Sequence, residues 1–250
     1  MKKLTLFLLV AIFLFSFSCE KKSTGPITHK PSFTIYGAVV KNLNLSKDIA
    51  AFTVSRNDTL YDGATVKAGN KSIPNVGSGL YYKEFSDTTF HMNTAYTDSI
   101  ISPTDTITIT FDFTMPDTFS IHITPVKDTF RLADFPIHVN WTASNSSNGY
   151  IIGVVKGDTI SGAALYSAIV PTSDGTQAVI QASAFENGAG NLVSGYYWIY
   201  VVAYNKSLPS YSGVPFTLPA GLPANNISGA QGTIGAGVIA KKAVIYVTTL

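Results

Sequence analysis

A chain of 250 residues is long enough for one large or two modest domains, each with its own core. Only 13% of the residues are charged, against a usual share of about 25%, and 12% are aromatic, which excludes a disordered chain. Lys2 and Lys3 lie in a segment that we expect to be removed. Without them, 15 basic residues balance 15 acidic ones, which argues against electrostatic capture of nucleic acid.

The first 18 residues are predicted to be a secretory signal peptide. A short positive start is followed by an almost unbroken apolar run over residues 4–17. This run is too short for a membrane span, which needs about 20 residues, but it fits the apolar core of a signal. Ser16 and Ser18 are small residues at the two positions that a signal peptidase reads.

Cys19, the only cysteine, follows the signal directly. The segment resembles the lipobox of bacterial lipoproteins, in which this cysteine becomes the lipidated first residue. It departs from that pattern at Ser16, where leucine is usual, and at Phe17, where a small residue is usual. Ordinary cleavage with a free thiol at Cys19 is the alternative, but one unpaired thiol in an exported chain favours lipid attachment. The resemblance implies a lipid anchor to a membrane of the bacterial cell envelope, with the outer membrane or cell surface favoured.

An all-β fold with two sandwich-like domains is expected after a polar tether over residues 19–32. The first domain is predicted over residues 33–116, where residues 106–115 alternate strictly between polar and apolar side chains. Period two over ten residues places one face of a strand in a core. The GATV segment at 63–66 resembles a motif of prealbumin-like sandwich domains, which implies a fold and no activity.

The second domain, residues 117–218, resembles a fibronectin type III domain. The resemblance is carried by the segments PIHVNWT at 136–142, GYIIGVV at 149–155 and YYWIYVVAYN at 196–205. It implies that Trp141 is the core tryptophan and that the Tyr197 hydroxyl forms the tyrosine corner by bonding to nearby backbone. The corner segment, residues 192–197, lacks the proline usual in the family.

Residues 219–250 are expected to be a glycine-rich extension that ends in a strand at 243–247. The glycines at 229–237 do not lead from a strand into a helix as a phosphate loop does, so tight turns or close packing are their expected roles. The order of lipidated cysteine, GAxV domain, fibronectin-like domain and glycine-rich ending resembles uncharacterised envelope lipoproteins of the Bacteroidota type. That resemblance implies a location and an architecture only.

No catalytic residues, metal site or cofactor are predicted. The four histidines have no metal-ligand spacing, and most aspartates occupy turn sequences. An aromatic row is the one candidate ligand-binding feature. If Tyr197 and every second residue after it face inward, the opposite face carries Tyr196, Trp198, Tyr200 and Tyr204.

Two interpretations of this row stay open: it stacks on sugar rings or anchors a partner, or another part of the chain covers it. Three functions follow in order of preference. The first is a non-enzymatic binding or adhesion module for an envelope protein or polysaccharide. The second is a purely structural envelope spacer, and the third is a hydrolase with an unrecognised aspartate pair.

Overall fold

The computed structural model describes residues 30–86, 88–157, 164–210 and 213–249. The predicted signal peptide and Cys19 lie outside the described residues. All described strands belong to one compact unit, Ser32–Leu250. The predicted all-β fold is confirmed, since strands dominate and the helices of the described part are short 3-10 turns. Among the described residues, no helix has the length and hydropathy that crossing a bilayer requires.

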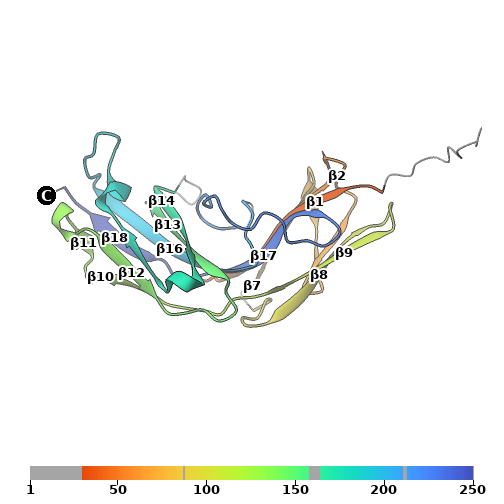
Figure 1. Ribbon diagram of the computed structural model, residues 1–250, viewed down its shortest axis with the longest axis horizontal. Helices are drawn as coiled ribbons and strands as arrows, with labels where there is room; N and C mark the ends of the chain where they lie inside the picture. Colours follow the sequence, from red (N-terminus) through yellow and green to blue (C-terminus); the bar gives the residue numbers. More distant parts are fainter. Residues whose placement is uncertain (1–29, 87, 158–163, 211–212, 250) are drawn as a thin grey trace, which may run out of the picture. The chain divides into compact units, whose positions relative to one another are not determined.

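The strands form one large sheet and two smaller ones (Figure 1). The strands of the large sheet are β1 (Phe33–Asn42), β2 (Lys47–Arg56), β3 (Thr59–Leu60), β6 (Asn75–Gly77), β7 (Leu80–Ser86), β11 (Thr129–Phe130), β13 (Gly149–Lys156), β14 (Tyr166–Pro171), β16 (Gly195–Asn205), β17 (Gln231–Ile239) and β18 (Ala243–Val247). The smaller sheets contain β4 (Thr65–Ala68), β5 (Lys71–Ile73), β8 (Ala95–Ser102) and β9 (Ile107–Thr114), and β10 (Ile121–Thr124), β12 (Ile137–Trp141) and β15 (Gln177–Ile180). The 3-10 turns are η1 (Leu132–Asp134), η2 (Thr172–Asp174) and η3 (Ala182–Phe185).

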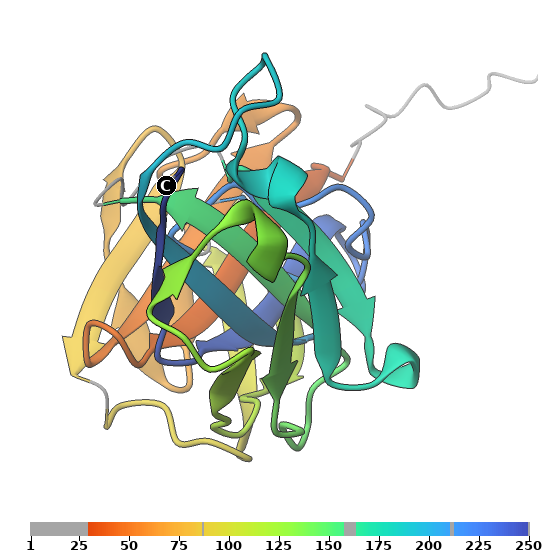
Figure 2. The same ribbon diagram turned by 90° about the vertical axis from the view of Figure 1, so that its left-hand side faces the viewer.

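The two smaller sheets pack against one face of the large sheet, which we call its inner face. The order β5-β4-β8-β9 covers the part formed by β1, β2 and β7, and the order β10-β12-β15 covers the part formed by β13 and β16 (Figures 1 and 2). Strand β9 illustrates why these segments are strands. Ile109, Phe111 and Phe113 are buried, while the threonines and Asp112 between them face water.

The second sandwich has the strand arrangement of a fibronectin type III-like module. Strands β10, β12 and β15 form its three-stranded sheet, and β14, β13 and β16 lie side by side in the facing sheet. Both core features expected from the sequence are confirmed. Trp141 is buried against Tyr150, with ring centroids 5.3 Å apart, and the Tyr197 hydroxyl donates a 2.7 Å hydrogen bond to the Val193 carbonyl oxygen.

The C-terminal residues contribute strands to both sandwiches. Strand β17 pairs in parallel with β1 along its length and antiparallel with the end of β16, while β18 pairs with the beginning of β16. The fibronectin-like sheet therefore takes strands from beyond residue 218. The glycine-rich segment is a strand and not a series of turns, and close packing explains Gly235, where a Cβ atom would lie 1.9 Å from the Ser207 carbonyl oxygen.

Candidate binding surface

The predicted aromatic row lies on the outer face of the large sheet, opposite the core of the two sandwiches. In the structure, the four side chains of this row differ in exposure. Tyr196 is 61% exposed and Trp198 is half-buried, but Tyr200 and Tyr204 are only 4% and 6% exposed. The interpretation that another part of the chain covers the row therefore holds for Tyr200 and Tyr204, whereas Tyr196 and Trp198 stay accessible to solvent.

The segment that covers Tyr200 and Tyr204 is the connection between β16 and β17. We call residues 206–226 the strap; residues 211–212 within it are not described. The strap runs over the sheet beside β13 and β17 (Figure 1), and its Leu208 and Phe216 belong to the same buried hydrophobic cluster as the two tyrosines. The Phe216 ring lies 6.1 Å from that of Tyr200 and rests on Gly153, where a Cβ atom would come within 2.7 Å. Burial raises the pKa of the Tyr200 hydroxyl to about 12.

Hydrogen bonds fasten the strap at its two ends. The Ser207 hydroxyl donates to the Pro223 carbonyl oxygen at 3.0 Å and so joins the start of the strap to its end. From β17, the Thr233 hydroxyl donates to the Ala224 carbonyl oxygen at 2.7 Å. Two hydrogen bonds and the burial of Phe216 together hold the strap on the sheet. The strap is therefore an integral part of the fold that covers the middle of the outer face.

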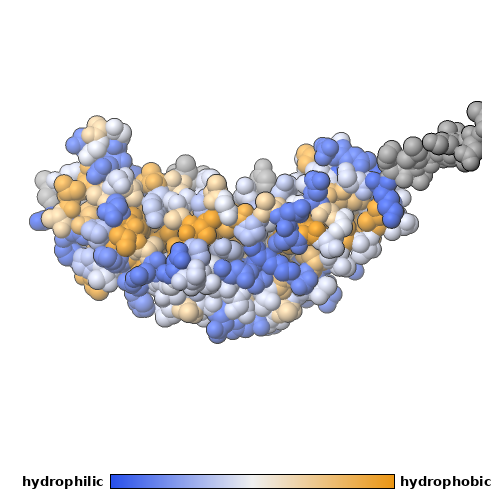
Figure 3. All heavy atoms as spheres, in the orientation of Figure 1, coloured by the Kyte–Doolittle hydropathy of each residue, from blue (hydrophilic) through white to orange (hydrophobic). Residues whose placement is uncertain are grey.

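The exposed part of the row belongs to a larger surface that includes β18. Its register pairs Tyr196 with Tyr246 and Trp198 with Val244, so the four side chains share one face. We call Tyr196, Trp198, Val244 and Tyr246 the rim patch. The Tyr196 and Tyr246 rings meet edge to face with centroids 5.0 Å apart, and the Lys242 ammonium lies over the Trp198 ring. Hydrophobic residues gather over the region of β16 in the space-filling view (Figure 3).

The sequence analysis did not identify Tyr246, Val244 and Lys242 as part of this surface. The alternation at 243–247 predicts a strand with Val244 and Tyr246 on one face, but it does not tell which strand lies beside it. Only the pairing with β16 joins them to the predicted row.

The buried ionisable groups of the core contact one another or backbone amides. Lys41 and Asp48 form a buried ion pair with a 2.6 Å distance from Nζ to Oδ1, and the other Asp48 oxygen accepts a hydrogen bond from the Phe90 amide. Asp98, on β8, is 1% exposed, and burial raises the pKa of its carboxyl to about 7. Within the described ranges, no three histidine, cysteine, aspartate or glutamate side chains are grouped to hold a metal ion.

No family model matches this chain, and no curated protein sequence matches it. Solved structures that match this chain include the fibronectin(III)-like modules of Clostridium thermocellum CbhA, with 11% identity, coverage of 87% of this chain and 93% of that chain, and a TM-score of 0.28. The Yersinia pseudotuberculosis adhesin InvE is 11% identical, with 86% and 59% covered and a TM-score of 0.25. Titin domains A168–A170 are 10% identical, with 86% and 66% covered and a TM-score of 0.24. A likeness at this level assigns no ligand or activity to this chain.

Proposed function

We propose that this protein is a non-enzymatic binding or adhesion module of the bacterial cell envelope, held to a membrane by lipid on Cys19. In this proposal the rim patch contacts an envelope protein or polysaccharide. The observation that carries it is the aromatic pair of Tyr196, which is exposed, and Tyr246, which is partly buried, on two hydrogen-bonded strands. Exposed aromatic rings on a rigid sheet offer a large contact area at a small cost in side-chain entropy.

The arrangement of the patch supports contact with a partner over contact with water alone. Tyr196 and Val244 are large apolar side chains that the fold leaves exposed, although the strap covers Tyr200 on the same face. Contiguous exposed apolar surface marks interaction sites in soluble domains. The Lys242 ammonium over Trp198 keeps that ring against the sheet, which favours a preformed surface.

A structural spacer is the second candidate, and the burial of Tyr200 and Tyr204 under the strap favours it. A spacer requires two folded sandwiches and no ligand. In that case the rim patch is only the end of the outer face that the strap does not cover. The two candidates differ in one measurable property, which is whether any envelope component binds the patch.

The binding test uses tryptophan fluorescence, because the chain has only two tryptophans. Trp141→Phe leaves Trp198 as the single fluorescent tryptophan. This change breaks no hydrogen bond among the described residues, because the Trp141 indole nitrogen has no partner there. A chain that begins at residue 26 retains all described strands. It is titrated with purified envelope polysaccharides and with fractionated envelope proteins.

A saturable fluorescence change that Tyr196→Ala abolishes supports the binding module. Leu60→Ala is the matched control, because Leu60 is exposed to a similar degree as Tyr196 but lies on β3, which pairs with β2, away from β16 and β18. If no fraction changes the fluorescence of Trp198, the spacer becomes the better description.

The membrane anchor has its own test. Cys19→Ala in the full chain should abolish the incorporation of labelled fatty acid and release the protein from the membrane fraction. Membrane attachment that persists without Cys19 would contradict the proposed anchor and would leave the binding test unaffected.

A further inference from the structure

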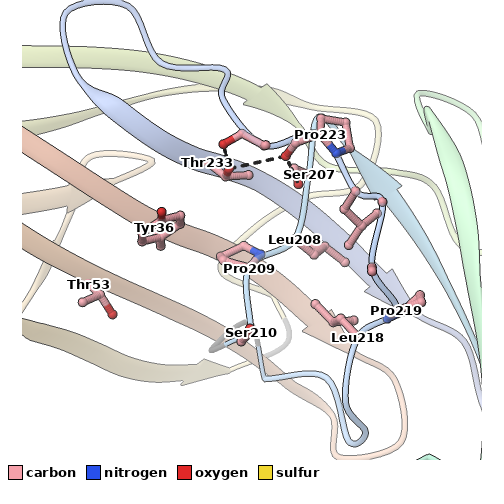
Figure 4. A pocket seen from close by; sticks show the side chains of 14 residues that line it. Tyr36, Thr53, Ser207, Leu208, Pro209, Ser210, Leu218, Pro219, Pro223 and Thr233 are labelled. Carbon is pink, nitrogen blue, oxygen red and sulfur yellow. Dashed lines mark hydrogen bonds between the residues drawn. The ribbon is translucent and has the colours of Figure 1, made fainter.

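A hollow lies on the outer face, where the strap leaves the part of the sheet formed by β17, β1 and β2 uncovered. It is a groove of about 610 Å³, with the sheet as its floor and the strap as its wall (Figure 4). Its volume lies within the range of about 300–1,000 Å³ that is usual for small-molecule sites. The residues that line it are Tyr36, Thr53, Ser207, Leu208, Pro209, Ser210, Leu218, Pro219, Ala220, Gly221, Leu222, Pro223, Ala224 and Thr233.

The floor is a row of three side chains that cross three neighbouring strands in register. Tyr36 on β1 is the direct partner of Thr53 on β2 and of Thr233 on β17. The three side chains therefore share one face, and Tyr36, in the centre, is 45% exposed. Figure 4 shows Tyr36 and Thr53 facing the space beside Pro209 and Ser210.

The described parts of the wall, residues 207–210 and 218–224, have a restrained backbone. Three of its residues are prolines, whose φ angles are restricted, and the bonds from Ser207 and Thr233 to the end of the strap hold its two arms together. The groove is therefore preformed, which lowers the entropic cost of binding a ligand.

The lining has an unusual chemical balance. None of its residues is charged, and five carry hydroxyl groups among leucine and proline side chains. The hydroxyls of Ser207 and Thr233 are used to fasten the strap. Those of Tyr36, Thr53 and Ser210 have no hydrogen-bond partner within the described part of the chain, so they are available to a ligand.

This balance excludes several ligand classes. An anionic ligand would meet no cation in the lining. A wholly apolar ligand would take the hydroxyls out of water without replacing their hydrogen bonds. An extended peptide strand has no edge to pair with here, because β1 lies between β17 and β2 and its backbone is already paired on both sides.

We propose that the groove binds an uncharged saccharide, with the apolar face of one sugar ring against Tyr36. The hydroxyls of Thr53 and Ser210 lie at the sides of that ring and exchange hydrogen bonds with the sugar hydroxyls. A sugar combines an apolar ring face with peripheral hydroxyls, which is the combination that the floor and wall provide. This site is separate from the rim patch, and the inference stands or falls independently of what the rim patch binds.

The experiment measures binding of neutral oligosaccharides by calorimetry to the chain that begins at residue 26. The probes are cello-, malto-, xylo- and β-1,3-gluco-oligosaccharides of six units, with oligogalacturonate as the anionic probe and a proline-rich peptide as the uncharged non-sugar probe. We expect saturable binding of at least one neutral oligosaccharide, with little dependence on salt.

Four variants locate the site. Tyr36→Ala should weaken binding about tenfold or more, whereas Tyr36→Phe, which keeps the ring, should retain most of it. Val126→Ala should bind as the unchanged chain does, because Val126 is exposed between β10 and β11 and belongs to neither the groove nor the rim patch. Tyr196→Ala reports separately on the rim patch. If Tyr36→Ala lowers the thermal stability of the fold, Thr53→Val replaces it, because it exchanges one hydroxyl of the floor for a methyl group of similar size.

Several results would overturn the inference. They are binding of no neutral oligosaccharide, binding of the anionic or peptide probe alone, or sugar binding that Tyr36→Ala and Thr53→Val leave intact. Sugar binding that only Tyr196→Ala abolishes would also overturn it, and that result would support the rim patch as the saccharide site instead.

Discussion

Asp98→Asn should remove a pH dependence of stability that originates inside the first sandwich. Asp98 is 1% exposed, and its Oδ1 accepts a 2.5 Å hydrogen bond from the Gly69 amide. Its Oδ2 has no partner among the described residues. Burial disfavours the charged form and raises the pKa of this carboxyl to about 7, although the Gly69 bond acts in the opposite direction.

The direction of the effect follows from this raised pKa. Below about pH 4 the carboxyl is protonated in both the folded and unfolded chain, and its full contribution to stability is present. Between pH 4 and 7 only the unfolded chain releases the proton, so stability falls as the pH rises. One pH unit corresponds to about 1.4 kcal/mol, so the group should cost about 4 kcal/mol of unfolding free energy between pH 4 and pH 8.

Urea unfolding followed by far-ultraviolet circular dichroism measures this loss at pH values from 4 to 8. Asparagine keeps the acceptor for the Gly69 amide but does not titrate, so the variant serves as the matched reference. Asp62, Glu84, Asp105 and Asp134 have lowered pKa values and titrate alike in both chains, so they cancel in the difference. A stability difference between the two chains that stays the same at pH 4 and pH 8 would refute the reasoning.

Three further substitutions test the packing. Lys41→Met leaves Asp48 without its buried partner and should lower the unfolding free energy by about 3–5 kcal/mol, and adding Asp48→Asn should restore much of it; a double variant no more stable than the single one would contradict this. Tyr197→Phe removes the bond to the Val193 carbonyl and should cost about 1 kcal/mol in the same assay. Gly235→Ala places a Cβ atom against the strap backbone, so it should displace the strap and speed its cleavage by a protease. An unchanged cleavage rate would contradict this, because it would show that the strap stays bound to the sheet.

Local sequence patterns predicted the elements whose structure depends on neighbouring residues. The alternation at 106–115 identified β9 and its buried face, and the resemblance to a fibronectin type III domain around Tyr197 implied both the inward row of β16 and the tyrosine corner. These predictions held because the side-chain period of a strand is a property of the backbone itself, and because the corner bond joins residues only four positions apart.

Predictions that depended on distant pairing could not be made in the same way. The glycines around Gly235 were compatible with turns or with close packing, because nothing in their own segment shows that the strap crosses them. The position of β17 between β1 and β16 depends on strands nearly 200 residues apart and on strands of the second sandwich. An alternating pattern indicates which side chains share a face but does not identify the neighbouring strand.

For the candidate surface, too, some properties follow from the local sequence and others from distant contacts. The sequence by itself determined that Tyr196, Trp198, Tyr200 and Tyr204 lie on one face of a strand, since alternate side chains of any strand point the same way. Only the tertiary structure decided that the strap buries Tyr200 and Tyr204 and that β18 extends the exposed end of the row. Burial depends on which segments meet in space, and an irregular, proline-rich segment such as the strap has no periodicity that would reveal its contacts.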